Sequence, residues 1–109
     1  MAIISNKDEY LRKCYFADVK NTAKQKIIAL IPGANEENYI EKEMNMLMRS
    51  NELLNKKIDG SISQDELNEI EENKALANQI NAIRAASNMI ENEIINNITY
   101  NYKETNIWP

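Results

Sequence analysis

Histidine is absent from the 109 residues, and the chain has only two glycines and two prolines. Without histidine, the chain lacks the commonest general base and the commonest ligand of transition metals. A GxGxxG loop needs three glycines, and Gly33 and Gly60 lie too far apart for a Walker-type loop, so neither phosphate-binding pattern occurs. We therefore expect a protein that is not an enzyme and that carries no cofactor.

Cysteine and long apolar runs are also scarce. The single Cys14 cannot form an internal disulfide, which fits a reducing compartment, and we expect it to be a small core residue. The apolar run at residues 27–31 is far too short to cross a bilayer. The first residues have no signal-peptide pattern. These observations predict synthesis in the cytoplasm and no membrane partner.

Charge is divided unevenly along the chain. Residues 1–31 hold six basic and three acidic side chains, whereas residues 32–109 hold seven and fourteen. Lys13, Lys20 and Lys24 share one face of the first predicted helix. Because arginine clusters and interleaved aromatic residues are lacking, we interpret this face as a contact for the same chain or for a protein partner, rather than for nucleic acid.

The first predicted helix covers about residues 6–31. Ser5 or Asn6 caps it, and Pro32 follows its end. Its apolar residues recur three or four positions apart, which is the spacing of one helical face. They are Leu11, Tyr15, Phe16, Val19, Ala23, Ile27, Leu30 and Ile31.

The second predicted helix covers about residues 36–58 and ends at Gly60, which can adopt a left-handed conformation. Its apolar residues are spaced alternately by four and three, the heptad pattern of a coiled-coil seam, with one polar break at Asn51. The seam consists of Ile40, Met44, Leu47, Asn51, Leu54 and Ile58. Met46 and Met48 flank Leu47, and we expect them to be adaptable core filler.

The third predicted helix covers about residues 64–98, and at roughly 50 Å it is too long for either other helix to cover alone. Its seam consists of Leu67, Ile70, Leu76, Ile80, Ile83, Ser87, Ile90, Ile94 and Ile98. We predict an all-α fold of three helices in one domain, residues 1–98, with an antiparallel hairpin of the second and third helices. The first helix would cover one side of this hairpin, and a second subunit or an assembly partner would cover the far end of the third helix. A monomeric three-helix bundle is the alternative.

Residues 99–109 form a predicted extended tail. Tyr100 and Tyr102 alternate with polar residues, and Ile107 and Trp108 lie at the end of the sequence. Aromatic residues in a tail can fold back onto their own helices or bind a partner protein. The sequence leaves both arrangements open.

Residues 58–67, IDGSISQDEL, resemble the second half of an EF-hand loop with Gly60 at the invariant glycine. The calcium ligands would be Asn55, Asp59, Ser61 and Glu66. Lys57, however, places a positive charge among these ligands. Ser63 and Glu66 also form the S-x-x-E pattern of a capping box. We therefore interpret this stretch as a boundary between two helices and expect no bound metal, with calcium binding as the weaker alternative.

Residues 82–91, AIRAASNMIE, followed by the final Trp108 and Pro109, resemble the C-terminal quarter of small bacteriophage tail and tail-assembly proteins. Those proteins often carry an IRAASN-like helix and end in a tryptophan–proline pair. Between these two features the present chain is rich in asparagine. The resemblance implies a structural or assembly role, with possible incorporation in a virion.

The sequence as a whole predicts a non-enzymatic structural or assembly protein of phage or prophage origin. It would act through helix–helix and tail contacts with further copies of itself or with other virion proteins. The predicted partner-binding residues are Arg84, Asn88, Glu91, Tyr100, Tyr102, Ile107 and Trp108. An alternative is a small acidic helical inhibitor or adaptor that binds a host protein, and a calcium-binding helical protein is the third possibility.

Overall fold

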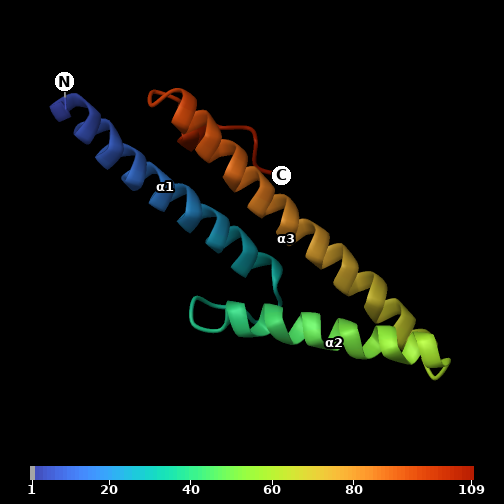
Figure 1. Ribbon diagram of the computed structural model, residues 1–109. Helices are drawn as coiled ribbons and strands as arrows, with labels where there is room; N and C mark the ends of the chain where they lie inside the picture. Colours follow the sequence, from blue (N-terminus) through green and yellow to red (C-terminus); the bar gives the residue numbers. More distant parts are fainter. Residues whose placement is uncertain (1) are drawn as a thin grey trace. The chain divides into compact units, whose positions relative to one another are not determined.

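The computed structural model describes residues 2–109, and it describes side chains from Lys7 onward. Figure 1 shows three helices and a short 3-10 turn. These elements are α1 (Ala2–Leu30), α2 (Tyr39–Asp59), α3 (Gln64–Asn96) and η1 (Tyr102–Glu104). No β-strand occurs within residues 2–109. The predicted all-α class is confirmed.

The observed helix boundaries lie close to the predicted ones, except at the start of α1. This helix begins at Ala2, four residues before the predicted start. The predicted caps, Ser5 and Asn6, fall outside the residues whose side chains are described. None of the helices, over their described residues, is long and apolar enough to cross a membrane.

The chain forms two compact units. Unit 1 consists of Met1–Lys26 and Asn81–Pro109, and unit 2 consists of Ile27–Ile80. Helices α1 and α3 each contribute residues to both units. The predicted tail, residues 99–109, belongs to unit 1.

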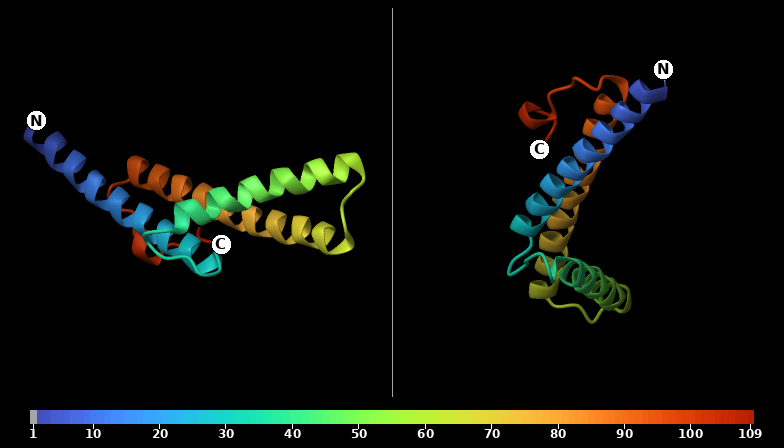
Figure 2. Two further views of the ribbon diagram at one scale, coloured as in Figure 1. Left: turned by 90° about the horizontal axis from the view of Figure 1, so that it is seen from below. Right: turned by 90° about the vertical axis from the view of Figure 1, so that its left-hand side faces the viewer.

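The core of unit 1 lies between α1 and the C-terminal part of α3, which run side by side in opposite directions (Figures 1 and 2). Val19, Ile90 and Ile94 form a buried cluster there. These residues belong to the predicted apolar stripes of the first and third helices, so both stripes are confirmed in this unit. Beside the cluster, Lys20 Nζ lies 2.8 Å from Glu91 Oε1, which gives the basic face of α1 an acidic contact within the chain.

The C-terminal tail folds back onto this cluster. The partly buried residues that pack against the cluster come from α1 and from the segment after α3, and they are Tyr15, Phe16, Ile98, Tyr100, Tyr102, Ile107 and Trp108. The Tyr102 ring centroid lies 5.0 Å from that of Tyr15, and the Tyr102 hydroxyl donates a 2.7 Å hydrogen bond to Asp18. Lys26 Nζ lies 5.5 Å from the Trp108 ring centroid. The tail therefore contacts its own chain, and the turn η1 interrupts the extended conformation that the sequence predicted.

These contacts raise the pKa of the Tyr102 hydroxyl. Burial of its ring, together with the hydrogen bond to the Asp18 carboxylate, raises the pKa of the Tyr102 hydroxyl to about 12. Both effects oppose a negative charge on the phenol. The hydroxyl therefore remains a hydrogen-bond donor to Asp18 well into the alkaline range.

Unit 2 contains an antiparallel hairpin of α2 and the N-terminal part of α3. Gly60 ends α2 with a positive φ of 82°, as a left-handed cap requires. Cross-helix contacts join Lys56 to Glu66 near the loop and Ser50 to Asn73 farther from it. The later residue of α2 thus contacts the earlier residue of α3, and the earlier residue of α2 contacts the later one. This is the antiparallel arrangement predicted for these two helices.

One expectation for α1 is wrong. Cys14 is exposed, although the sequence suggested a core position. The residue after it, Tyr15, belongs to the apolar stripe, and neighbouring residues on a helix point about 100° apart at 3.6 residues per turn. The Cys14 side chain is consequently directed away from the core of unit 1.

Candidate functional site

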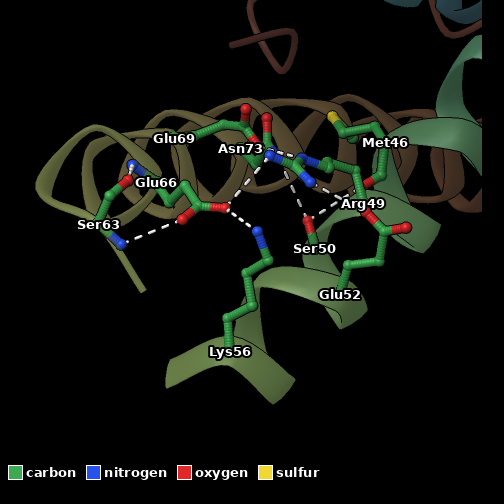
Figure 3. Close-up of polar contacts among 9 residues, drawn as sticks. All are labelled: Met46, Arg49, Ser50, Glu52, Lys56, Ser63, Glu66, Glu69 and Asn73. Atoms are coloured by element: carbon green, nitrogen blue, oxygen red, sulfur yellow. Dashed lines mark hydrogen bonds and ion pairs between the residues drawn. The ribbon is translucent and has the colours of Figure 1, made fainter. Parts of the chain in front are cut away.

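Most of the less exposed residues of α2 are polar, and Figure 3 shows the polar contacts that join them to α3. Arg49 Nε donates a 2.7 Å hydrogen bond to Glu69, and Lys56 Nζ donates a 2.6 Å bond to Glu66. Leu53 is the one fully buried residue of α2, with 0% of its surface exposed. A single buried leucine with cross-helix ion pairs therefore holds this side of the hairpin.

The start of α3 has the capping box that the sequence predicted. The Ser63 backbone N–H donates a 3.0 Å hydrogen bond to Glu66, and the Glu66 backbone N–H donates a 3.2 Å bond to the Ser63 hydroxyl. This reciprocal pair satisfies two backbone donors at the first turn of the helix. The serine and the glutamate thus act as a helix boundary.

The same contacts bear on the calcium alternative. Glu66, the residue at the bidentate ligand position, already binds Lys56 and Ser63. Asp59 accepts hydrogen bonds of 2.9 Å and 2.6 Å from the Ser61 backbone and hydroxyl, which lower the pKa of Asp59. Asn55 is exposed. Among the described residues, no group of three or more cysteine, aspartate or glutamate side chains is arranged to hold a metal ion.

Substitution Glu66→Gln is expected to reduce the acid sensitivity of unfolding. Hydrogen bonds from Lys56 and from the Ser63 backbone lower the pKa of Glu66 from 4.5 to about 2. Because the folded-state pKa is depressed, the carboxylate stabilises the fold above pH 4.5, and this contribution is lost as pH falls from 4.5 to about 2. The variant should be less stable than wild type at pH 7, and the two should converge at pH 2.

Urea unfolding followed by circular dichroism at the two pH values measures this difference. Glu71→Gln is the matched control, since Glu71 is an exposed residue of the same helix, and its effect should be similar at both pH values. A deficit of the Glu66 variant that is equally large at pH 2 and pH 7 would contradict the assignment.

A groove of about 520 Å³ borders this network within unit 2. Its charged lining has both signs, with Lys42 and Arg49 on α2 and Glu69 and Glu72 on α3. The Arg49–Glu69 hydrogen bond joins two of these side chains directly. The polar lining of the groove is thus partly engaged in holding the hairpin.

The other side of α2 carries a row of large apolar side chains that are exposed. We call this surface the α2 apolar face. It comprises Ile40, Met44, Leu47, Met48, Leu54 and Ile58, whose exposed fractions range from 46% to 84%. Asn51, also exposed, lies within it. The heptad seam predicted for the second helix thus does not form the core of the hairpin, and the expectation that Met48 is core filler is wrong.

The two sides of α2 follow from the geometry of the helix. Leu54 is one residue from Leu53 and therefore points about 100° away from it, while Asn51 points about 160° away. When Leu53 is buried against α3, the seam residues are turned out of the hairpin. Six large apolar side chains along one helix form the kind of exposed patch that commonly marks an interaction site.

The predicted partner-binding residues all lie in unit 1. Glu91 contacts Lys20, and Tyr100, Tyr102, Ile107 and Trp108 pack against the buried cluster of that unit. Asn88 and Arg84 are exposed on α3, and Arg84 makes a further contact within the chain. Their binding of a partner stays a prediction, while the tail residues already serve an internal role.

Sequence reasoning missed the polar network of the hairpin, although a signal for it is visible. Arg49 and Lys56 are seven residues apart and share a side of α2, and Glu66 and Glu69 are three apart at the start of α3. Opposite charges on facing sides of two helices can form cross-helix pairs. The network indicates which side of α2 faces α3.

Comparison of the chain with protein-family models found no match, and comparisons with curated proteins and with solved structures found no similar protein.

Proposed function

We propose that this chain is a non-enzymatic structural or assembly protein, of phage or prophage origin, that acts through helix–helix contacts with other proteins. The α2 apolar face is the observation that carries the proposal. Its side chains retain about half or more of their surface exposed, and covering them with a partner would remove apolar area from water.

The shape and composition of this surface support a helical partner. The six side chains follow one side of a helix that its own cap and hairpin contacts already hold in place. A preformed helix loses little conformational entropy on binding, so more of the interaction energy appears as affinity. Apolar residues at heptad spacing fit a second helix that packs knobs into holes.

The phage origin and virion incorporation rest on the sequence of the C-terminal quarter. Residues 82–91 form part of α3, and Trp108 packs in unit 1. Because the tail contacts its own chain, we assign partner contact first to α2 and treat the tail as a support of unit 1. An apolar face exposed on a helix that the chain already holds in place suits an assembly role.

Site-specific photocrosslinking in cells that express the chain tests the proposal. A photoreactive residue replaces Met48, which is 64% exposed on the α2 apolar face, and in a control replaces Met89, which is 56% exposed on α3. We expect covalent adducts from position 48 that are weak or missing from position 89. Mass spectrometry identifies the protein in each adduct.

The identity of the adduct separates the two candidate functions. A further copy of the chain or a particle protein supports an assembly role. A host enzyme or regulator would instead favour the alternative of an acidic inhibitor or adaptor. Equal labelling at positions 48 and 89 would reject the α2 apolar face as the interaction surface.

A further inference from the structure

We infer that the partner of the α2 apolar face is a second copy of this chain, which pairs in parallel so that the two Asn51 side chains meet in the interface. This inference rests on the proposed function, because it names the partner of the same surface. It depends on the register of the apolar residues, the position of the polar residue among them, and the charge of α2.

The register of the face matches that of a two-stranded coiled coil. Steps of four and three place Met44, Asn51 and Ile58 at heptad position a, and Ile40, Leu47 and Leu54 at position d. Leucine at d is favourable in parallel dimers. One asparagine at an a position is the feature that sets register and two-stranded association in such coils.

Asn51 argues for an identical partner. A buried amide needs both a donor and an acceptor opposite it. A second copy aligned in parallel places another Asn51 at the same level, and each amide can then donate to the other. A partner with an apolar residue at that level would leave the amide of Asn51 without a hydrogen bond.

The charge of α2 permits two copies to approach. The whole chain has a net charge of −4, which opposes association. The sequence of α2, however, contains four acidic and four basic residues, so the contact surface belongs to a helix without net charge. In the parallel register, the positions on either side of the apolar seam place Ser50 of one copy beside Asn55 of the other. No like charges meet at this pair.

An antiparallel pair is the main competitor. In full overlap it would place the acidic start of one α2 beside Lys57 of the other, and two exposed ion pairs would strengthen association by at most about 5-fold each. It would also set each Asn51 against Leu47 of the other copy. Each buried amide without a partner weakens association by about 5- to 150-fold, so the parallel arrangement is favoured.

The length of the face bounds the affinity. From Ile40 to Ile58 the helix extends for about 28 Å at 1.5 Å per residue. This is a small interface compared with those of stable complexes. We therefore expect dimerisation at concentrations of about 10–100 µM, where many weak complexes form.

Sedimentation equilibrium over about 1–500 µM protein, bracketing this concentration range, is the first test. The wild-type mass should rise with concentration from 12.6 kDa towards twice that value. Met44→Glu should weaken the dimer at least about 100-fold, because both copies then bury a carboxylate. Met89→Glu should leave it unchanged, and it is a close control, since Met44 is 57% and Met89 is 56% exposed.

Disulfide crosslinking tests the parallel pairing. The exposed Cys14 is first removed by Cys14→Ser. Met44→Cys in that background should form a disulfide between two copies, because equal positions meet in a parallel pair. Disulfides formed only when the Met44→Cys and Leu54→Cys proteins are mixed would show the antiparallel arrangement and overturn the Asn51 pairing.

The remaining outcomes separate this inference from the proposed function. A wild-type chain that stays monomeric up to the highest concentration would overturn the second copy as partner. Crosslinks from position 48 to a different protein would then still uphold the proposed function. A dimer equally resistant to Met44→Glu and Met89→Glu would show that the copies associate through another surface.

Discussion

Substitution Ile94→Ala is expected to lower the free energy of unfolding by about 2–5 kcal/mol, the usual cost of removing a fully buried isoleucine side chain. Ile94 has 0% of its surface exposed and packs with Val19 and Ile90 at the centre of unit 1. The alanine would leave a cavity where α1, α3 and the tail meet. Few rearrangements can fill it, because the residues around it belong to separate segments of the chain.

Ile95→Ala is the matched control, with the same chemistry at the next position of α3. Ile95 is 51% exposed, so its truncation should change the free energy of unfolding by only about 0.5 kcal/mol. Urea unfolding monitored by circular dichroism at low micromolar concentration measures both variants. Equal shifts of the unfolding midpoint for the two variants would contradict the assigned core of unit 1.

Trp108→Ala is expected to have the second largest effect and to lower the free energy of unfolding by about 2–3 kcal/mol. This is less than the cost of removing a fully buried tryptophan, because the Trp108 ring is only partly buried. The ring packs against the cluster of Val19, Ile90 and Ile94. Lys26 Nζ, 5.5 Å from its centroid, adds a cation–π contact, which contributes about 0.5–1 kcal/mol at an exposed site.

Two comparisons give this prediction its specificity. Tyr10→Ala removes an aromatic ring that is 67% exposed on α1, and it should have little effect on unfolding. Lys26→Met should retain most of the stability that Trp108→Ala loses. In the wild type, fluorescence of the single tryptophan should shift to longer wavelength on unfolding. A folded-state spectrum identical to that of the unfolded chain would show that the tail is not packed.

The sequence predicted α1 and α3 well because each has one dominant apolar stripe. In α3 the predicted seam residues Ile80, Ile83, Ile90 and Ile94 are all buried, and the polar member Ser87 is 6% exposed. A stripe that has no competitor on its helix identifies the buried side directly. The class of fold follows from such stripes together with the helix caps.

The orientation of α2 was beyond this kind of reasoning. Periodicity shows that Ile40 to Ile58 form one side of a helix, but it does not show what covers that side. The short connection from Gly60 to Ser63 and the pairs of Arg49 and Lys56 with acids of α3 turn a less apolar side towards α3. The more apolar side remains exposed, and the proposed interaction surface is found there.

The tail and Cys14 show a second limit. Alternation of Tyr100 and Tyr102 with polar residues correctly separated the tail from α3, yet it gave equal support to docking within the chain and to docking on a partner. The hydrogen bond from Tyr102 to Asp18 joins residues 84 positions apart, a pairing that local patterns do not contain. The exposure of Cys14 likewise depends on the rotation of α1 against its neighbours.

The division into a continuous unit and a discontinuous one has a consequence during protein synthesis. The contacts of unit 2 noted above join residues 10 to 23 positions apart, so this unit can complete its hairpin soon after Ile80 is made. The part of the α1 apolar stripe that lies in unit 1, with Val19 at its centre, must wait for Ile90, Ile94 and the tail. Roughly 80 residues separate Lys26 from Trp108, and at 5–20 residues per second the growing chain bears that stripe uncovered for about 4–16 s. During this interval the uncovered part of the first helix is open to misassociation between nascent chains.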